Sequence, residues 1–144
     1  MLKLKKKYKD KKYEIIKKYN LTANFYDDRY SKIQKEKYFL LLKDFKLNDK
    51  IILDAGTGTG ILFFYLLIKK KLNRHLKYAF VGIDISIEML TIFKEKLKKL
   101  NNNNTNLILA DLEHLPIRQD AFSYIFSLTA LQNLSDITKG IIEL

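Results

Sequence analysis

The chain has 144 residues, of which 47% are apolar and 30% charged, a length and composition typical of one globular domain. It has no cysteine, which excludes disulfides, thiolate metal sites and cysteine nucleophiles, and its two histidines, His75 and His114, are too few to build a metal centre. The longest uncharged apolar run, residues 61–68, is far shorter than the roughly 20 residues of a membrane-spanning helix. Because the N-terminus also lacks the apolar core of a secretory signal, we expect a cytoplasmic protein with no membrane contact.

The net charge of +11 is concentrated at the N-terminus, where residues 1–20 contain nine lysines and two acidic residues. In this segment Leu4, Tyr8, Ile15 and Tyr19 fall near one face of a helical period, which predicts a basic amphipathic helix. Such a helix would attract phosphate groups, so RNA is one expected partner. The alternative is a solvated lysine-rich helix in a chain whose composition favours Lys, Asn and Ile.

A second helical pattern precedes residue 48. Tyr38, Leu41, Leu42 and Phe45 recur at helical spacing, which predicts a helix that covers the core. We therefore expect an N-terminal helical, Lys-rich segment at residues 1–48 and a second part at residues 49–144.

From Lys50 onward, short apolar runs alternate with longer amphipathic ones, a pattern typical of βαβ units and a parallel sheet. Strands are expected at residues 51–54, 78–83, 107–110 and 124–128, and helices at residues 61–70, at 87–100 and from residue 137. Ser86 is expected to cap the second of these helices, and Ser135 or Asp136 the third. The sequence therefore predicts the α/β fold class.

The strongest functional signal is the segment Ile51–Gly60, whose glycines at 56, 58 and 60 let a small polar ligand lie against the backbone. A dinucleotide-binding turn would need its third glycine at position 61, where the chain has Ile61, and no Gly-Lys-Ser/Thr of a phosphate loop follows. Asp54, just before the turn, would repel a pyrophosphate but suits a ligand that carries an ammonium group. The alternative is a structural turn that binds nothing.

Two further aspartates follow predicted strands. Asp84 ends the second strand roughly 20 residues beyond the glycine turn, where a carboxylate can accept hydrogen bonds from both hydroxyls of a ribose. A helix cap is an equally good use of this residue. Asp111 follows the third strand and could accept a hydrogen bond from the exocyclic amine of adenine, or it is an ordinary loop aspartate.

Neutral polar side chains follow the fourth predicted strand. Ser127, Thr129, Gln132 and Asn133 would lie at the carboxyl edge of the sheet, where ligands bind in open α/β folds. Such groups orient a substrate but are poor general bases. The alternative is that they start a loop and cap a helix.

In their order and spacing, the motifs Asp54-Ala-Gly-Thr-Gly-Thr-Gly60, Asp84-Ile-Ser86, residues 110–117 and residues 122–128 resemble the class I S-adenosylmethionine-dependent methyltransferases. The resemblance covers residues 50–144. It implies a Rossmann-like parallel sheet with strand order 3-2-1-4, flanked by helices, as part of the family's seven-stranded sheet. Residues 49–144 would then form an S-adenosylmethionine-binding domain, preceded by N-terminal helices.

The resemblance implies that the cofactor is S-adenosyl-L-methionine, and no metal is expected. It places the methionine part of the cofactor on Asp54 and the backbone of residues 56–60, and the ribose on Asp84. Tyr26 and Tyr30 are expected to close over the cofactor. The cofactor-binding residues expected are Asp54, Ala55, Gly56, Thr57, Gly58, Gly60, Asp84, Ile85 packed on the adenine, Asp111 and Leu112 at the adenine edge, Ser127 and Tyr26.

The expected function is transfer of a methyl group to a small molecule or RNA, with no catalytic residue assigned. The fourth motif is not of the Asn-Pro-Pro-Tyr type, which disfavours exocyclic amines and glutamine amides as acceptors. The alternative is a truncated module of the same fold that binds the cofactor or a partner without catalysis. A nicotinamide-dependent oxidoreductase and a pure RNA-binding protein explain fewer of the motifs.

The resemblance ends at the fourth of the family's seven strands. In the order 3-2-1-4 that strand would be an exposed apolar edge with unpaired backbone groups, which native proteins pair or cover. We therefore expect a truncated or split methyltransferase, or one whose edge pairs with a second copy or another protein.

Overall fold

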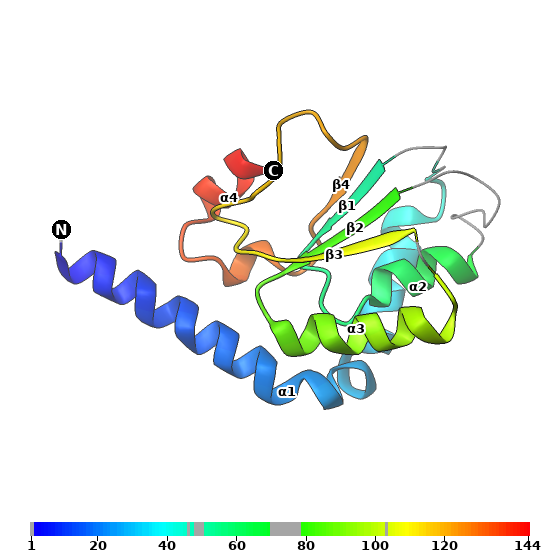
Figure 1. Cartoon of the computed structure of the whole chain (residues 1–144), viewed down its shortest axis with the longest axis horizontal. Helices are drawn as coiled ribbons and strands as arrows, with labels where there is room; N and C mark the ends of the chain where they lie inside the picture. Colours follow the sequence, from blue (N-terminus) through cyan, green and yellow to red (C-terminus); the bar gives the residue numbers. More distant parts are fainter. Residues whose placement is uncertain (1, 46, 48–50, 70–78, 103) are drawn as a thin grey trace.

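Figure 1 shows the computed structural model of the chain, which describes residues 2–45, 47, 51–69, 79–102 and 104–144, with the backbone alone for residues 2–10. The elements in chain order are helix α1 (Leu2–Leu42), strand β1 (Ile51–Ala55), helix α2 (Ile61–Ile68), strand β2 (Ala79–Asp84), helix α3 (Ile87–Lys99), strand β3 (Thr105–Leu109), strand β4 (Tyr124–Phe126), the 3-10 turn η1 (Leu131–Asn133) and helix α4 (Ile137–Glu143).

The four strands form one parallel sheet in the order β3-β2-β1-β4. In the central strand β1, Leu53 lies opposite Val81 of β2 on one side and Ile125 of β4 on the other. Because all strands run in the same direction, their carboxyl ends meet at one edge of the sheet, which we call the carboxyl edge. The α/β fold class, the parallel sheet and the strand order 3-2-1-4 are confirmed.

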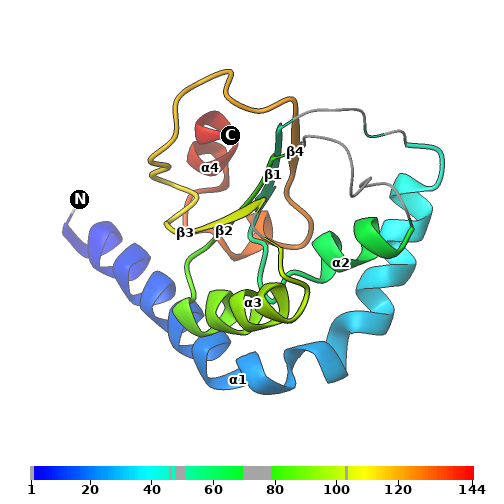
Figure 2. The same ribbon diagram turned by 45° about the vertical axis from the view of Figure 1, so that its right-hand side comes forward.

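Helices and loops cover both faces of the sheet (Figure 2). On one face α2 and α3 bury Phe63, Phe80 and Phe93, whose ring centroids lie 5.1, 5.6 and 6.5 Å apart. On the other face α4 and the connection between β3 and β4 lie over a smaller cluster that includes Leu53 and Ile83. Both faces are therefore apolar, which leaves the edges of the sheet for a polar site.

The N-terminal helix differs most from prediction, because α1 is one helix over residues 2–42 and not two. Tyr38 and Leu42 are buried as predicted, but Leu41 is 61% exposed, so its prediction as a core residue is wrong. The buried side chains Gln34, Tyr38 and Leu42 are four residues apart, which makes a narrow stripe that excludes Leu41. Phe45 lies beyond the end of the helix, and its ring packs edge-on against β4.

The apolar face predicted for the first 20 residues is seen in part. Ile15 and Tyr19 are half-buried and turned toward the domain, as predicted. The side chains of Leu4 and Tyr8 lie outside the described part of the chain.

The predicted element boundaries shift by a few residues. Strand β3 begins at Thr105, and β4 ends at Phe126, which leaves Ser127 in the following loop. Helix α2 ends at Ile68, which is 71% exposed, so this helix is not buried all round as predicted. Tyr78 and Lys70, predicted to start a strand and end a helix, lie outside the described residues.

Both predicted helix caps are present. The Ser86 hydroxyl accepts a hydrogen bond from the Met89 backbone N–H at 3.2 Å at the start of α3. At the start of α4 the cap is Asp136, whose carboxylate accepts from the Lys139 N–H at 3.0 Å; Ser135, the other candidate, is not the cap.

Strand β4 lies at the edge of the sheet, as predicted, and Ile125 at its centre is 40% exposed. Because β4 pairs in parallel with β1, the polar segment after β4 lies beside the glycine turn after β1. Among the helices of the described residues, none is both long enough and apolar enough to span a bilayer.

Candidate functional site

The glycine turn after β1 is held against β2 by its backbone. The N–H groups of Gly56 and Thr57 both donate to the carbonyl of Ile83, at 2.8 and 2.9 Å. Gly56, Gly58 and Gly60 have φ values of +85°, +55° and +82°, in the left-handed region that favours glycine. The sequence pattern therefore encodes a tight turn from β1 into α2.

The glycines serve two different purposes. A Cβ atom on Gly60 would stand 2.4 Å from the ring of Phe93, so this glycine lets the turn pack on α3. A Cβ atom on Gly58 would meet no protein atom within 4 Å, although Gly58 lines a pocket. Gly58 therefore leaves backbone open to a ligand.

This pocket lies at the carboxyl edge and is partly open to solvent. Its walls come from α1, from the glycine turn and from the ends of β2, β3 and β4. The lining residues are Lys12, Ile15, Tyr19, Tyr26, Gly56, Gly58, Asp84, Ile85, Met89, Asp111, Leu112, Glu113, Thr129, Ala130, Asn133, Leu134 and Ser135.

Asp84 is the carboxylate at the end of β2 and lies on the pocket wall. One of its oxygens accepts from the Gly58 N–H at 2.8 Å and the other from the Ser86 N–H at 2.9 Å. Burial raises the pKa of Asp84 above its ordinary value, and the backbone hydrogen bonds oppose this shift. Because Ser86 caps α3, the alternative that Asp84 is the cap is not what the structure shows. The Ile85 backbone N–H also donates to this carboxylate, and a carboxylate has about four acceptor sites, so one remains for a ligand.

Asp54 is not on the pocket wall. Its side chain is buried under the glycine turn, where it accepts a hydrogen bond from the Thr57 hydroxyl at 2.8 Å. Burial raises its pKa to about 7, with the Thr57 hydrogen bond acting in the opposite direction. The structure thus gives Asp54 a place in shaping the turn, separate from the residues that line the pocket.

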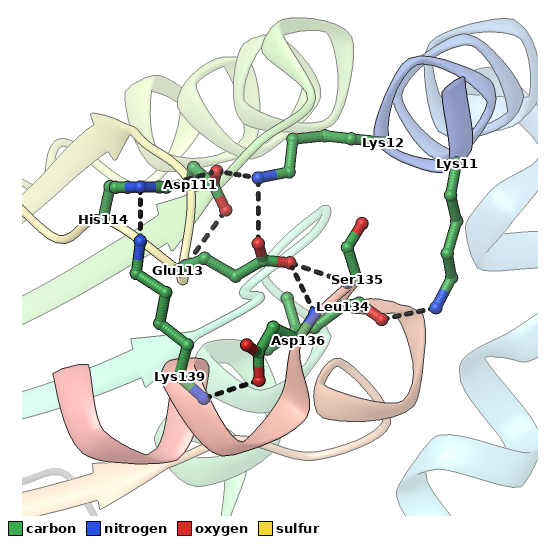
Figure 3. A network of polar contacts seen from close by, with 9 residues as sticks. All are labelled: Lys11, Lys12, Asp111, Glu113, His114, Leu134, Ser135, Asp136 and Lys139. Atoms are coloured by element: carbon green, nitrogen blue, oxygen red, sulfur yellow. Dashed lines mark hydrogen bonds and ion pairs between the residues drawn. The ribbon is translucent and has the colours of Figure 1, made fainter. Parts of the chain in front are cut away.

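Asp111 lies on the wall but is already engaged (Figure 3). It pairs with Lys12 of α1, accepts from the Glu113 N–H at 3.0 Å and contacts His114 Nδ1 at 3.3 Å. Burial acts to raise its pKa, but the hydrogen bonds from Lys12 and from the Glu113 backbone outweigh burial and hold the pKa below its ordinary value.

Glu113 extends this network into the segment before α4. One carboxylate oxygen lies 3.1 Å from Lys12 Nζ, and the other accepts from the N–H groups of Ser135 at 2.6 Å and Asp136 at 3.2 Å. Lys11, next along α1, donates to the carbonyl of Leu134. Burial lowers the pKa of Lys12, but the two carboxylates outweigh this effect and raise it above its ordinary value. Figure 3 shows Lys11 and Lys12 reaching from α1 to Leu134, Asp111 and Glu113.

Helix α1 crosses the whole carboxyl edge. It sends at least one polar side chain to the loop after each strand, and four of these side chains are seven or eight residues apart, so they share one face of the helix. In chain order the contacts are Lys12 with Asp111 after β3, Asn20 with the Ser86 hydroxyl after β2 at 2.6 Å, Asp27 with the Thr59 hydroxyl after β1, and Gln34 with Thr129 after β4 at 3.0 Å. The contacts follow the order of the strands in the sheet.

A comparison with family models matches residues 52–144 to the model described as methyltransferase domain. The chain belongs to this methyltransferase family. Its glycine turn, Asp84 and the segments after β3 and β4 all lie within the matched residues.

Two curated relatives are methyltransferases by name. The malonyl-[acyl-carrier protein] O-methyltransferase of Marinomonas sp. (strain MWYL1) is 32% identical over 122 residues, which are 84% of this chain and 42% of the relative. The ubiquinone/menaquinone biosynthesis C-methyltransferase UbiE of Rickettsia prowazekii (strain Madrid E) is 28% identical over 127 residues, 88% of this chain and 50% of the relative. The methyltransferase domain described here thus spans about half the length of these relatives.

A solved structure agrees with the same fold. A SAM-dependent methyltransferase from Aquifex aeolicus superposes with a TM-score of 0.61 at 27% identity, covering 78% of this chain and 62% of the other.

The methyltransferase domain brings most of the predicted cofactor residues to one pocket. Seven of them line it: Gly56, Gly58, Asp84, Ile85, Asp111, Leu112 and Tyr26. The others do not: Asp54, Ala55, Thr57 and Gly60 are buried in or beneath the turn, and the Ser127 hydroxyl donates to the Ala55 carbonyl at 3.1 Å.

Among the aromatic and polar side chains of α1 and of the segment after β4, some line the pocket and others do not. Tyr30 packs on Tyr26 with ring centroids 4.8 Å apart, but it does not line the pocket. Thr129 and Asn133 line it, and Asn133 donates to the Tyr19 hydroxyl at 2.9 Å. Gln132 is exposed and is not part of the wall.

Sequence reasoning missed Lys12, Asn20 and Glu113. The lysine-rich pattern of residues 1–20 signalled a charged helix, but not that one lysine turns back onto the domain. Residue Glu113 stands within the Ala110–Ile117 motif, yet its buried position depends on contacts with α4 and α1. Within the described residues, no cluster of three or more His, Cys, Asp or Glu could hold a metal ion.

Proposed function

We propose that this chain binds S-adenosyl-L-methionine in the carboxyl-edge pocket and, as part of a methyltransferase, positions its methyl group for transfer. The observation that carries the proposal is the convergence of three features on one pocket. These are the open backbone at Gly58, the Asp84 carboxylate and the apolar pair Ile85 and Leu112. The family of the chain and its curated relatives support the same reading.

The pocket suits the parts of this cofactor. Asp84 is held in place by backbone N–H groups, among them those of Gly58 and Ser86, and its remaining acceptor site can receive a ribose hydroxyl. Ile85 and Leu112 offer apolar surface for the adenine ring. The space beside Gly58 leaves room for the methionine part, because no side chain projects there.

The residues of the site bind and orient, and none needs to transfer a proton. When bound, the cofactor supplies an electrophilic methyl group on a sulfonium. Rate enhancement then comes from holding acceptor and donor in line and at contact distance. Tyr19, Tyr26, Thr129 and Asn133 are neutral groups at the β4 side of the pocket, where they can fix an acceptor. Helix α1 contributes Tyr19 and Tyr26 to this side of the pocket.

We favour a small-molecule or carrier-bound acceptor over RNA. One curated relative is named for malonyl-[acyl-carrier protein] and the other for ubiquinone/menaquinone biosynthesis. In addition, Lys11 and Lys12 turn inward to the domain and are not free to meet a phosphate backbone. RNA binding by residues 1–20 remains the second candidate, tested by whether RNA affinity falls steeply with salt and is lost when these residues are deleted.

Cofactor binding is tested by calorimetric titration of the 144-residue chain with S-adenosylmethionine and S-adenosylhomocysteine. We expect micromolar binding that Asp84→Ala weakens by about 1.5–3 kcal/mol, the value of hydrogen bonds to a charged group. Glu88→Ala, on the exposed first turn of α3, is the matched control and should bind like the parent. A folded parent chain that binds neither compound would refute the proposal.

The alternative function is a cofactor-binding or partner-binding module without catalysis. It is favoured by the exposed edge of β4. We propose that a second copy, another protein or further sequence covers this edge. Methyl transfer from labelled cofactor to a small-molecule extract, by the chain alone and with added cell lysate, separates the two functions. Transfer by neither mixture, with cofactor binding intact, would favour the module.

A further inference from the structure

Helix α1 forms one wall of the pocket, and its two ends are attached to the domain in different ways. Beyond residue 22, α1 is anchored by buried side chains, among them Ala23, Tyr38 and Leu42. We call residues 11–22 the entry segment. None of its side chains is fully buried, and its contacts with the rest of the domain include polar ones made by Lys11, Lys12, Tyr19 and Asn20.

The entry segment closes the pocket on the side of Asp84 and Asp111. Lys12, Ile15 and Tyr19 line the pocket from this segment. Figures 1 and 2 show the N-terminal part of α1 extending beyond α3 toward the segment before α4. A cofactor that fills the pocket is therefore enclosed only when the entry segment is in place.

The two carboxylates that pair with Lys12, those of Asp111 and Glu113, are held in place by other contacts as well. Glu113 is held by the N–H groups of Ser135 and Asp136, and Asp111 by the Glu113 N–H and by His114. The side chain of Lys12 is 27% exposed, so water can replace its carboxylate partners when the segment moves away. Because the two carboxylates keep their positions without Lys12, its ion pairs can break and form again without unfolding of the domain.

We propose that Lys12 is a positioning residue that latches the entry segment over the bound cofactor, so that opening of the Lys12 ion pairs with Asp111 and Glu113 limits cofactor release. This inference rests on the proposed function, because it concerns the same pocket. It goes further by assigning the rate of cofactor exchange to one side chain of α1.

The test compares Lys12→Met, which keeps most of the side-chain length and loses the charge, with Lys17→Met, an exposed lysine of the same segment. The dissociation rate of S-adenosylhomocysteine is measured by stopped flow after mixing with excess competitor. Tyrosine fluorescence is the signal, since the chain has no tryptophan and Tyr19 and Tyr26 line the pocket. We expect Lys12→Met to release the ligand roughly tenfold faster, as loss of two partly exposed ion pairs predicts. Lys17→Met should match the parent.

Salt and a conservative variant separate the latch from a general loss of structure. Dissociation from the parent should accelerate with added NaCl, because salt screens the ion pairs, and dissociation from Lys12→Met should not. Lys12→Arg should restore slow, salt-sensitive release. An unchanged rate in Lys12→Met, or equal salt dependence in both proteins, would overturn the latch.

Hydrogen exchange of the ligand-free chain keeps the two proposals distinguishable. We expect the amides of residues 13–22 to exchange faster in Lys12→Met than in Lys17→Met, with the strands unchanged. If the parent binds no cofactor, the proposed function fails, and this comparison still decides whether Lys12 holds the segment. Equal exchange in the two variants would overturn the latch by itself.

Discussion

A Cβ atom on Gly56 would stand 2.2 Å from the Cβ of Ala130, so the backbone of the turn after β1 packs directly on the Ala130 methyl group after β4. Gly56 also has a φ of +85°. We expect Gly56→Ala to lower the free energy of unfolding by more than about 2 kcal/mol, from overlap and left-handed backbone together. Urea unfolding measures this. Ala130→Gly in the same background should recover only part of the loss, and full recovery would show that the φ value contributes nothing.

Gly58→Ala should separate binding from folding. Its φ of +55° predicts a stability loss of roughly 1–2 kcal/mol, without the overlap found at Gly56. The added methyl group would, however, take up space beside the ligand, so we expect cofactor affinity to fall at least about tenfold. Calorimetry and urea unfolding on the same samples test this, and a variant that binds like the parent would refute the assignment of Gly58 to the ligand-facing wall.

Asp54 predicts a pH dependence of stability. Its pKa is about 7 in the folded chain against an ordinary 3.8, so between these values the folded state binds more protons than the unfolded state. The contribution of Asp54 to stability is therefore most favourable below about pH 4, decreases as the pH rises toward 7, and is constant above. The full change is at most on the order of 4 kcal/mol.

Asp54→Asn should remove this dependence and keep the oxygen that accepts from Thr57. We expect the stability of the variant relative to the parent to be higher at pH 8 than at pH 5, measured as the urea midpoint of each protein. A difference between variant and parent that does not change with pH would show that Asp54 has an ordinary pKa.

Ser86 joins the start of α3 to α1. Its hydroxyl accepts from the Met89 N–H and donates to Asn20, and the side chain is fully buried. We expect Ser86→Ala to lower the free energy of unfolding by about 1–2 kcal/mol through the lost cap. Thr91→Ala is the matched control, since its exposed hydroxyl bonds only the Ile87 carbonyl one turn back. Equal losses in both variants would contradict the role given to the cap.

The sheet and the pocket walls near it were predictable because their signals are local. Alternating apolar runs determine β1 to β4, and glycine spacing and Asp84 each act within a few residues of a strand end. Asp54 ends β1 as predicted, but its side chain is buried beneath the glycine turn and does not line the pocket. Side chains of a strand alternate between faces, so Asp54 shares the face of Ile52, yet the pattern alone does not say where a ligand lies relative to that face.

The contacts of α1 were not predictable for a different reason. Lys12 lies 99 residues from Asp111 in the chain, and Gln34 lies 95 residues from Thr129. The spacing of apolar residues in the first 42 residues cannot predict these distant pairs, because a helical pattern indicates only which face of the helix is buried. The same limit explains Leu41, whose helical spacing fitted a core face that proved narrower than expected.

The four contacts of α1 with the strand ends also determine when this helix can dock. It is synthesised before every loop that it contacts, and its partners stretch from Thr59 to Thr129. The four contacts can therefore all be present only after the segment after β4 has been synthesised and has folded. Until then, the wall that α1 contributes to the pocket is incomplete.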